Sequence, residues 1–214
     1  MKVIEIFDSI DGEGIFTGCL ATFIRLAGCN MRCSYCDTKY SFTGGKEMSI
    51  EEIEDIVYTI GNRHITLTGG EPLIHRDIGE LISRLCEAGC IVNIETNGSC
   101  DVQQYQNENT VITMDYKTGS SGENSKMNVD RINTLRESDV LKIVCEEQDF
   151  YDITHLLTQI TTDAHIFLSP IFGKIEPELL VEFSKQLRNC GINKDIRVQV
   201  QLHKIIWNPD ERGV

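Results

Sequence analysis

The sequence predicts an α/β protein, an open and partial parallel β/α barrel built as one domain over residues 1–214. Three observations support this. Short β-branched runs alternate with helical patterns along the chain, which implies parallel strands joined by right-handed crossovers. The 214 residues are 41% hydrophobic, which is enough for one globular core. About six or seven strands can be read from the pattern, fewer than the eight of a closed barrel.

Each expected strand is a short run rich in β-branched residues and bounded by polar residues or glycine. The expected strands cover residues 21–26, 64–68, 91–95, 111–115, 140–145, 166–169 and 196–201. Three of them end in the motifs Gly69-Gly70-Glu71-Pro72, Thr96-Asn97-Gly98 and Tyr116-Lys117. A glycine pair can simply turn the chain, but in parallel α/β folds the carboxyl edge of the sheet carries the site. We therefore expect these strand ends to meet at one functional site.

Four helices are expected between the strands. Ser49 is a good N-cap, and Glu52, three residues later, completes a capping box. The helix that follows carries an apolar stripe at helical spacing, formed by Ile50, Ile53, Ile56, Val57 and Ile60. The other helices are expected over residues 78–85 with Gly89 placed to end it, over about 150–160, and between Pro177 and Gly191.

Composition excludes several classes of partner. Lys and Arg number 20 against 33 Asp and Glu, so the formal net charge is −13, which argues against a broad nucleic-acid-binding face. The acidic residues Asp8, Asp11 and Glu13 come too early for a signal peptide. No stretch approaches the roughly 20 apolar residues that a membrane span needs. We expect a cytoplasmic protein without a nucleic-acid or membrane partner.

Nine cysteines are present, and this odd number argues against full disulfide pairing. Six of them are scattered and are expected to be small buried hydrophobic residues: Cys19, Cys86, Cys90, Cys100, Cys145 and Cys190. The other three, Cys29, Cys33 and Cys36, lie within eight residues. Soft thiolates at this density select an iron–sulfur cluster or zinc. A structural zinc site needs a fourth ligand, for which only Cys19 is near, whereas a four-iron cluster with three protein ligands keeps one iron open.

The cysteine spacing, together with Thr68-Gly69-Gly70-Glu71-Pro72 downstream, resembles the radical S-adenosylmethionine (SAM) superfamily. The resemblance implies a [4Fe–4S] cluster on Cys29, Cys33 and Cys36, S-adenosylmethionine chelated by the open iron, and an external flavodoxin-like or ferredoxin-like electron donor. It assigns the bond-breaking chemistry to the cofactor and to no side chain. The residues implied to contact S-adenosylmethionine are Tyr35, Gly69, Gly70, Glu71, Gly98, Asp115, Tyr116, Lys117, Ser169, Pro170, Ile171 and Phe172.

Further motifs narrow the resemblance. They are Asp8-Ser9-Ile10-Asp11-Gly12-Glu13-Gly14, Phe23-Ile24-Arg25-Leu26-Ala27-Gly28-Cys29, Asp37-Thr38 and Glu95-Thr96-Asn97-Gly98. Over nearly the whole chain they resemble the 7-carboxy-7-deazaguanine synthase family of the 7-deazapurine (queuosine) pathway. The resemblance implies a homodimer that converts 6-carboxy-5,6,7,8-tetrahydropterin to 7-carboxy-7-deazaguanine with loss of ammonia. It leaves open whether the product serves tRNA, DNA or a secondary metabolite.

The same resemblance implies roles for individual residues. Thr38 is matched to a Mg²⁺ ligand, since its hydroxyl is a hard oxygen donor. The residues implied to bind the substrate are Ile10, Asp11, Gly12, Glu13, Arg25, Thr96 and Val214. Arg25 presents a planar fork suited to a carboxylate, and Glu13 suits the guanidine-like edge of a pterin. Val214 is expected to bring its terminal carboxylate to the pterin, although chain ends are by default frayed.

The chain departs from the family pattern at two places. Asp11 stands where many relatives carry Gln, and Asp115-Tyr116 stands before Lys117 where many carry Ser-Pro. Several assignments also have ordinary structural alternatives. Tyr35 could pack in the core, Thr38 could cap a loop, Arg25 could form a surface salt bridge, and residues 169–172 could be a simple turn.

Two other functions remain open from the sequence. One is a radical SAM activase that acts on a protein partner, which would share the cluster but would not need Glu13, Arg25 and Thr38. The other is a zinc-bound structural or interaction module, which would need a fourth ligand beside the cysteine loop.

Overall fold

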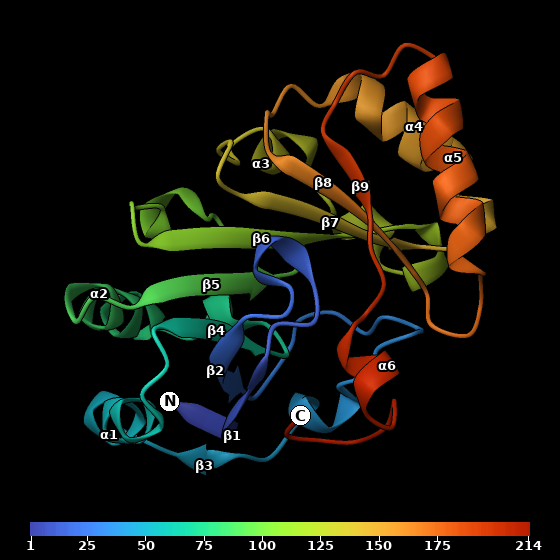
Figure 1. Ribbon diagram of the computed structural model, residues 1–214. Helices are drawn as coiled ribbons and strands as arrows, with labels where there is room; N and C mark the ends of the chain where they lie inside the picture. Colours follow the sequence, from blue (N-terminus) through green and yellow to red (C-terminus); the bar gives the residue numbers. More distant parts are fainter.

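The computed structural model describes residues 1–214 as one mixed sheet with helices packed against it (Figure 1). The strands are β1 (Lys2–Ile10), β2 (Leu20–Leu26), β3 (Lys46–Glu47), β4 (His64–Gly69), β5 (Ile91–Thr96), β6 (Thr110–Lys117), β7 (Val140–Cys145), β8 (His165–Pro170) and β9 (Ile196–Val198). The helices are α1 (Ile50–Ile60), α2 (Ile78–Glu87), α3 (Val129–Ile132), α4 (Phe150–Gln159), α5 (Pro177–Asn189) and α6 (His203–Ile206).

The sheet has the order β3-β1-β2-β4-β5-β6-β7-β8-β9. All neighbours from β2 to β9 pair in parallel, as the alternation of strands and helices predicted. The edge strands β3 and β9 do not pair with each other, so the sheet stays open. The prediction missed β1 and β3, which pair antiparallel at one edge. Polar residues interrupt β1 at Glu5 and Asp8, which hid its strand pattern.

The helix boundaries follow the capping signals in the sequence. The Ser49 hydroxyl accepts from the Glu52 amide at 3.2 Å and the Glu52 carboxylate accepts from the Ser49 amide at 2.8 Å, which confirms the capping box. Pro177 is the first residue of α5. The expected stripe on α1 was wrong at Ile56, whose side chain is 36% exposed, because the face that packs on the sheet is narrower than the stripe.

The side chains along each parallel strand alternate in direction. One set points to an apolar outer face of the sheet and the other set points to a polar inner face. On β4, Ile65 and Leu67 are fully buried in the core cluster under the helices. Successive side chains of a strand point to opposite faces. The inner face therefore receives Thr66 and Thr68 from β4, Asn93 and Glu95 from β5, Thr113, Asp115 and Lys117 from β6, and Lys142 from β7. Eight polar side chains inside the curved sheet make this face a site rather than a second apolar core.

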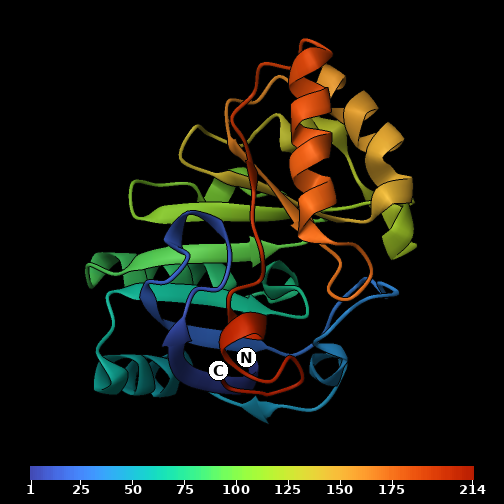
Figure 2. The same ribbon diagram turned by 45° about the vertical axis from the view of Figure 1, so that its right-hand side comes forward.

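The open side of the barrel is covered by two segments that are far apart in the sequence, the loop of residues 11–19 and residues 199–206. Leu202 N donates to Gly12 O at 3.0 Å, and Gly14 N donates to the Gln199 side chain at 2.8 Å. Figures 1 and 2 both show the red C-terminal segment running past the blue loop between β1 and β2. The expected strand at 196–201 is shorter and ends at Val198. Gln199 N still donates to Leu168 O of β8 at 3.0 Å, but the side chains of Gln199 and Gln201 bond to the loop 11–19.

None of the helices has the length and the apolar character that a membrane crossing requires.

Candidate active site

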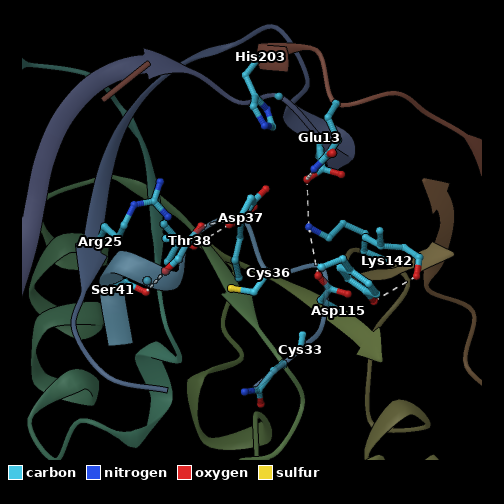
Figure 3. A pocket seen from close by; sticks show the side chains of 18 of the residues that line it. Glu13, Arg25, Cys33, Cys36, Asp37, Thr38, Ser41, Asp115, Lys142 and His203 are labelled. Carbon is cyan, nitrogen blue, oxygen red and sulfur yellow. Dashed lines mark hydrogen bonds and ion pairs between the residues drawn. The ribbon is translucent and has the colours of Figure 1, made fainter. Parts of the chain in front are cut away.

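A cavity of about 490 Å³ opens at the carboxyl ends of the parallel strands and is enclosed by the loop 11–19 and the C-terminal segment (Figure 3). Most of the residues predicted for a site line it. They are Ile10, Asp11, Gly12, Glu13, Arg25, Cys29, Cys33, Tyr35, Cys36, Thr38, Gly69, Gly70, Thr96, Asp115, Lys117, Ile171, Phe172 and Val214. Five predicted cofactor contacts do not line it, namely Glu71, Gly98, Tyr116, Ser169 and Pro170.

The three thiols of the cysteine loop share one wall of this cavity. Cys29, Cys33 and Cys36 are free and half-buried. The pKa of Cys33 is raised by burial, and the ammonium of Lys117 opposes that rise. Each thiolate of a four-iron cluster binds its own iron, so the sulfurs have to surround a shared space. All three cysteines line this one cavity, while Cys19, the fourth ligand that a zinc site would need, is exposed and outside it.

The cysteine loop is held by hydrogen bonds at its base and its tip. At the base, Gly28 N donates to Ser41 O at 2.7 Å. At the tip, Arg32 N donates to the Glu123 carboxylate at 2.8 Å and Ser34 N donates to Ser121 O at 2.9 Å. The Tyr35 hydroxyl donates to Val144 O at 3.3 Å, so that its ring forms part of the cavity wall. The loop is thus fixed before any metal binds.

Gly69 and Gly70 bring the end of β4 against the cysteine loop. A Cβ on Gly70 would lie 2.0 Å from Gly28 O and 2.8 Å from the Cys29 Cβ. Gly69 has φ +147°, and a Cβ there would lie 2.3 Å from Leu26 O. The sequence had suggested that these glycines leave space for a ligand. The structure shows that the backbone of residues 26–28 occupies the space where their side chains would be.

Glu71 anchors this motif from behind the cavity and is fully buried. Its carboxylate accepts from the Thr96 hydroxyl at 2.8 Å, from Asn97 N at 2.6 Å and from Leu73 N at 3.0 Å. It therefore ties the end of β4 to the end of β5, a role that the sequence alone did not reveal. Buried carboxylates of this kind are stable only when hydrogen-bonded.

The other predicted cofactor contacts that lie outside the cavity bond to or pack against neighbouring residues instead. The Tyr116 hydroxyl accepts from Asn124 at 3.0 Å on the outer face of β6. Gly98 has φ +73° and lies against Met114, which leaves no room for a Cβ. The Ser169 hydroxyl donates to Glu13 at 3.3 Å and accepts from Gln199 at 2.9 Å, so it orients a residue that does line the cavity.

Arg25 is pre-oriented toward the cavity. Its Nε donates to Glu5 at 2.7 Å, and the same Glu5 oxygen accepts from the Tyr40 hydroxyl at 2.7 Å. No protein group accepts from the two terminal nitrogens of Arg25, whose side chain is only 16% exposed. Arg25 does form a salt bridge, but the pair is partly buried and involves only Nε, so the two terminal nitrogens of the guanidinium stay unpaired.

A chain of opposite charges crosses the inner face of the sheet. Lys142 Nζ lies 3.1 Å from Glu13 and 3.4 Å from Asp115, and Lys117 Nζ lies 2.9 Å from the same Asp115 oxygen (Figure 3). Burial disfavours all these charges, but their mutual attraction prevails, so the pKa of Asp115 is lowered and those of Lys117 and Lys142 are raised. The other oxygen, Asp115 Oδ1, is buried and has no hydrogen-bond partner.

The donor set of this cavity fits an iron–sulfur cluster with S-adenosylmethionine beside it. The three free thiols supply the soft ligands that such a cluster requires. The unpartnered Asp115 Oδ1 on the cavity wall needs a hydrogen-bond donor, and an ammonium or a ribose hydroxyl would fit that need.

Thr38 and the C-terminal tail meet at the cavity mouth. The Thr38 hydroxyl donates to Asp37 at 2.9 Å, and the other Asp37 oxygen lies 2.8 Å from Lys204 Nζ. Burial disfavours the Asp37 carboxylate, but Lys204 outweighs this effect and the pKa of Asp37 is lowered. The guanidinium of Arg212 lies 3.9 Å above the Tyr40 ring, and Val214 lines the cavity.

Several ionisable residues of the cavity were not predicted from the sequence as site residues. Among them are Asp37, Glu95, Lys142, His203 and Lys204. A usable signal existed for Lys142, because a charged residue flanked by apolar neighbours in a buried parallel strand must face a polar interior. The tail residues carry no such signal, since their contacts depend on how the tail folds back.

The chain is similar in sequence and in structure to proteins of known activity. The sequence profile of the Radical SAM superfamily matches residues 23–165. The chain is 39% identical to a 7-carboxy-7-deazaguanine synthase from Clostridium acetobutylicum, over 100% of this chain and 99% of that protein. It is 37% identical to one from Methanospirillum hungatei, over 98% of this chain and 86% of that protein. A crystal structure of QueE from Escherichia coli matches with a TM-score of 0.73 and 27% identity, covering 94% of each chain.

Proposed function

The chain belongs to the radical SAM superfamily and, within it, to the 7-carboxy-7-deazaguanine synthases, and from this membership we propose what its cavity does. The substrate is 6-carboxy-5,6,7,8-tetrahydropterin, and the product is 7-carboxy-7-deazaguanine, formed with loss of ammonia. The enzyme thereby serves 7-deazapurine biosynthesis. The role of each residue below is part of the proposal.

One observation carries the proposal: a single cavity holds three free thiols and also two differently charged substrate-binding faces. The free fork of Arg25 suits a carboxylate. The carboxyl groups of Asp11, Glu13 and Glu95 suit an edge rich in N–H groups. A carboxypterin carries a carboxylate at one end and a guanidine-like edge at the other, so it matches both faces.

Cys29, Cys33 and Cys36 would hold the cluster, and Gly70 and Asp115 would position S-adenosylmethionine. When bound, these groups supply the radical that removes a hydrogen atom from the substrate. The protein binds and orients the reactants and excludes water. Lys142 contributes by holding the Glu13 carboxylate in place at 3.1 Å. The loop 11–19 and the C-terminal segment cover part of the cavity and so limit the access of water.

We further propose that Thr38 would hold Mg²⁺, which would supply positive charge for the substrate carboxylate near Arg25. Thr38 lines the cavity and its neighbour Asp37 adds a second oxygen at 2.9 Å from its hydroxyl. Hydroxyl and carboxylate oxygens are the ligands that Mg²⁺ prefers. Omission of Mg²⁺ from the assay should then raise KM for the pterin, and Thr38→Val should abolish the response to Mg²⁺.

We also propose that the protein works as a cytoplasmic homodimer of one domain per chain, supplied with electrons by a flavodoxin-like or ferredoxin-like protein. The dimer and the donor follow from the family resemblance of the sequence, and membership of the radical SAM superfamily supports the need for an electron donor. All nine cysteines are free, as in proteins of reducing compartments.

The test is turnover under strict exclusion of oxygen. Reconstituted protein is given S-adenosylmethionine, reductant and the carboxypterin, and the deazaguanine product is detected by mass spectrometry. Release of 5′-deoxyadenosine without the deazaguanine would contradict the synthase and favour an activase that acts on a protein partner. A colourless protein that retains one zinc per chain would contradict the radical chemistry altogether.

A further inference from the structure

Asp11 and Glu95 are two carboxyl groups of the cavity that have no cationic partner. Glu13 and Asp115 are paired with Lys142, and Asp37 is paired with Lys204. No lysine, arginine or histidine nitrogen lies within ion-pair distance of Asp11 or Glu95. Two uncompensated carboxylates in one enclosed cavity cannot both stay charged without a large cost.

Asp11 is rigidly placed for a role in binding. Its backbone amide donates to Cys19 O at 2.9 Å, and its carbonyl accepts from Gly18 N at 2.8 Å, which fixes the base of the loop 11–19. Its side chain is only 2% exposed and lines the cavity. Both carboxyl oxygens share the single hydroxyl of Thr66, at 2.8 and 3.0 Å. Asp11 therefore has spare hydrogen-bonding capacity that faces the ligand.

The groups around Asp11 come from four elements. Burial and the repulsion from Glu95 on β5 raise the pKa of Asp11 to about 7, Glu13 adds to the rise, and Thr66 and Asn93 oppose it. Lys142 on β7 is already shared between Glu13 and Asp115. On α6, burial lowers the pKa of His203 from its ordinary value of 6.5, so this imidazole is neutral above that pH. Asp11 and Glu95 thus lie in one cavity without a countercharge, bonded to Thr66 and Thr68 on the same face of β4.

We propose that Asp11 and Glu95 form one two-carboxyl subsite that holds a single proton in the free enzyme and releases it to solvent when the N–H-rich edge of the pterin binds. This inference rests on the proposed function. The ligand's N–H groups replace the proton, because each carboxylate accepts hydrogen bonds best when it is charged. Glu95 is already oriented, since it accepts from the Thr68 hydroxyl at 2.7 Å.

The pH dependence follows from linkage. Below about pH 7 the free enzyme holds the proton and the complex does not, so binding releases it and the Kd falls about tenfold for each unit by which the pH rises. Above that pH the proton is already lost, so release tends to zero and the Kd becomes independent of pH.

The experiment titrates the reconstituted holoenzyme with S-adenosylmethionine and the carboxypterin, without reductant, so that no turnover occurs. Calorimetry in two buffers of different ionisation enthalpy, at about pH 6.5 and about pH 8.5, gives the number of protons released. The expected result is a release at the lower pH that nearly vanishes at the higher one. Asp11→Asn should abolish the release, and Glu95→Gln should move its midpoint to lower pH because the repulsion is gone.

Asp8→Asn is the matched control, since Asp8 is an exposed carboxylate three residues earlier that accepts from Asn62 at 2.6 Å outside the cavity. It should release protons as the wild type does. Infrared spectroscopy of the free holoenzyme adds an independent readout, a protonated-carboxyl band that Asp11→Asn lacks. Binding and turnover without proton release, or release that persists in Asp11→Asn, would overturn the subsite alone. Absence of pterin binding would overturn the proposed function as well.

Discussion

Arg25 is set in position before any ligand arrives. Glu5 accepts from its Nε at 2.7 Å, and the guanidinium lies between the rings of Phe7 and Tyr40, 5.8 and 5.9 Å from their centres. A half-buried guanidinium held on one edge has little freedom left to lose when its other edge binds a carboxylate. This explains why a strand residue, and not a flexible surface lysine, stands at this point of the cavity.

Arg25→Lys should weaken carboxypterin turnover selectively. A lysine keeps the charge but cannot form the two parallel hydrogen bonds of a fork, and loss of about 3 kcal/mol corresponds to a roughly hundredfold lower kcat/KM. Steady-state kinetics under anaerobic conditions measure this, and iron content should stay at the wild-type value. Arg63→Lys, a change at an exposed arginine, is the control and should leave kcat/KM unchanged. Equal kcat/KM for Arg25→Lys and the control would exclude the carboxylate role.

At the residue scale, the buried apolar residues of the strands were predicted from the sequence better than the polar residues that face the cavity. Ile65, Leu67 and Ile94 fit the strand pattern and are fully buried. Lys142 and Glu95 sit in the same buried strands, where the pattern was taken only as apolar. Their partners, Glu13 and Thr68, are distant in the sequence, so pairing could not be inferred before the strands were placed in order.

At the scale of elements, the site is an assembly of strand ends pressed against one loop. The cysteine loop meets the end of β4 through Gly70, and Glu71 ties β4 to the end of β5 through Asn97 N at 2.6 Å. Asn97 in turn donates to Asn30 of the cysteine loop at 2.9 Å. The loop, β4 and β5 therefore form one rigid corner around the three thiols.

Gly70→Ala should break this corner and lower the capacity for a cluster. The new Cβ would lie 2.0 Å from Gly28 O, which is backbone and has to shift. Iron content and the visible absorbance of protein reconstituted under exclusion of oxygen measure the loss, and most of the iron should be missing. Gly79→Ala is the control because its Cβ would make an ordinary 3.5 Å contact with the Tyr105 ring. Full cluster loading of Gly70→Ala would show that the close approach is not needed.

The ends of helices and strands were predicted well where the residues that determine them are close in the sequence. They were predicted poorly where those residues are far apart in the sequence. The capping box at Ser49 and the proline at the start of α5 act within a few residues, and both were confirmed. The end of β9 depends on Gln199 bonding to Gly14, 185 residues away, so no local pattern could reveal it. The spacing of the three cysteines predicted the site for the same reason, because these residues lie close together in the sequence.

At the scale of the whole molecule, an open sheet becomes an enclosed site because two distant segments cover it. Leu202 N bonds to Gly12 O at 3.0 Å, and the His203 ring occupies the space beside Gly12, where a Cβ would lie 2.1 Å from its Nδ1. Lys204 then reaches Asp37 at 2.8 Å. The loop 11–19, the C-terminal segment and the cysteine loop are thus linked to one another around the cavity.

Removal of residues 212–214 should raise KM for the carboxypterin while the melting temperature stays near that of the wild type. Arg212 lies over the Tyr40 ring at 3.9 Å, and such a contact contributes about 1 kcal/mol, or roughly fivefold in KM. Exposed tail residues add little to the core, so stability should hardly change. Arg212→Ala separates the ring contact from the effect of Val214. Unchanged turnover of the shortened chain would show that the tail does not reach the substrate.

The dependence of the cavity on residues 199–206 also determines when it can form during synthesis. Strands β1 to β8 can leave the ribosome and pair while this segment is still unmade. Until it emerges, the thiols line an uncovered groove that water and oxygen can reach. Insertion of the cluster into a nascent chain would therefore expose the cluster to damage. We expect the cluster to be inserted only after the chain has left the ribosome.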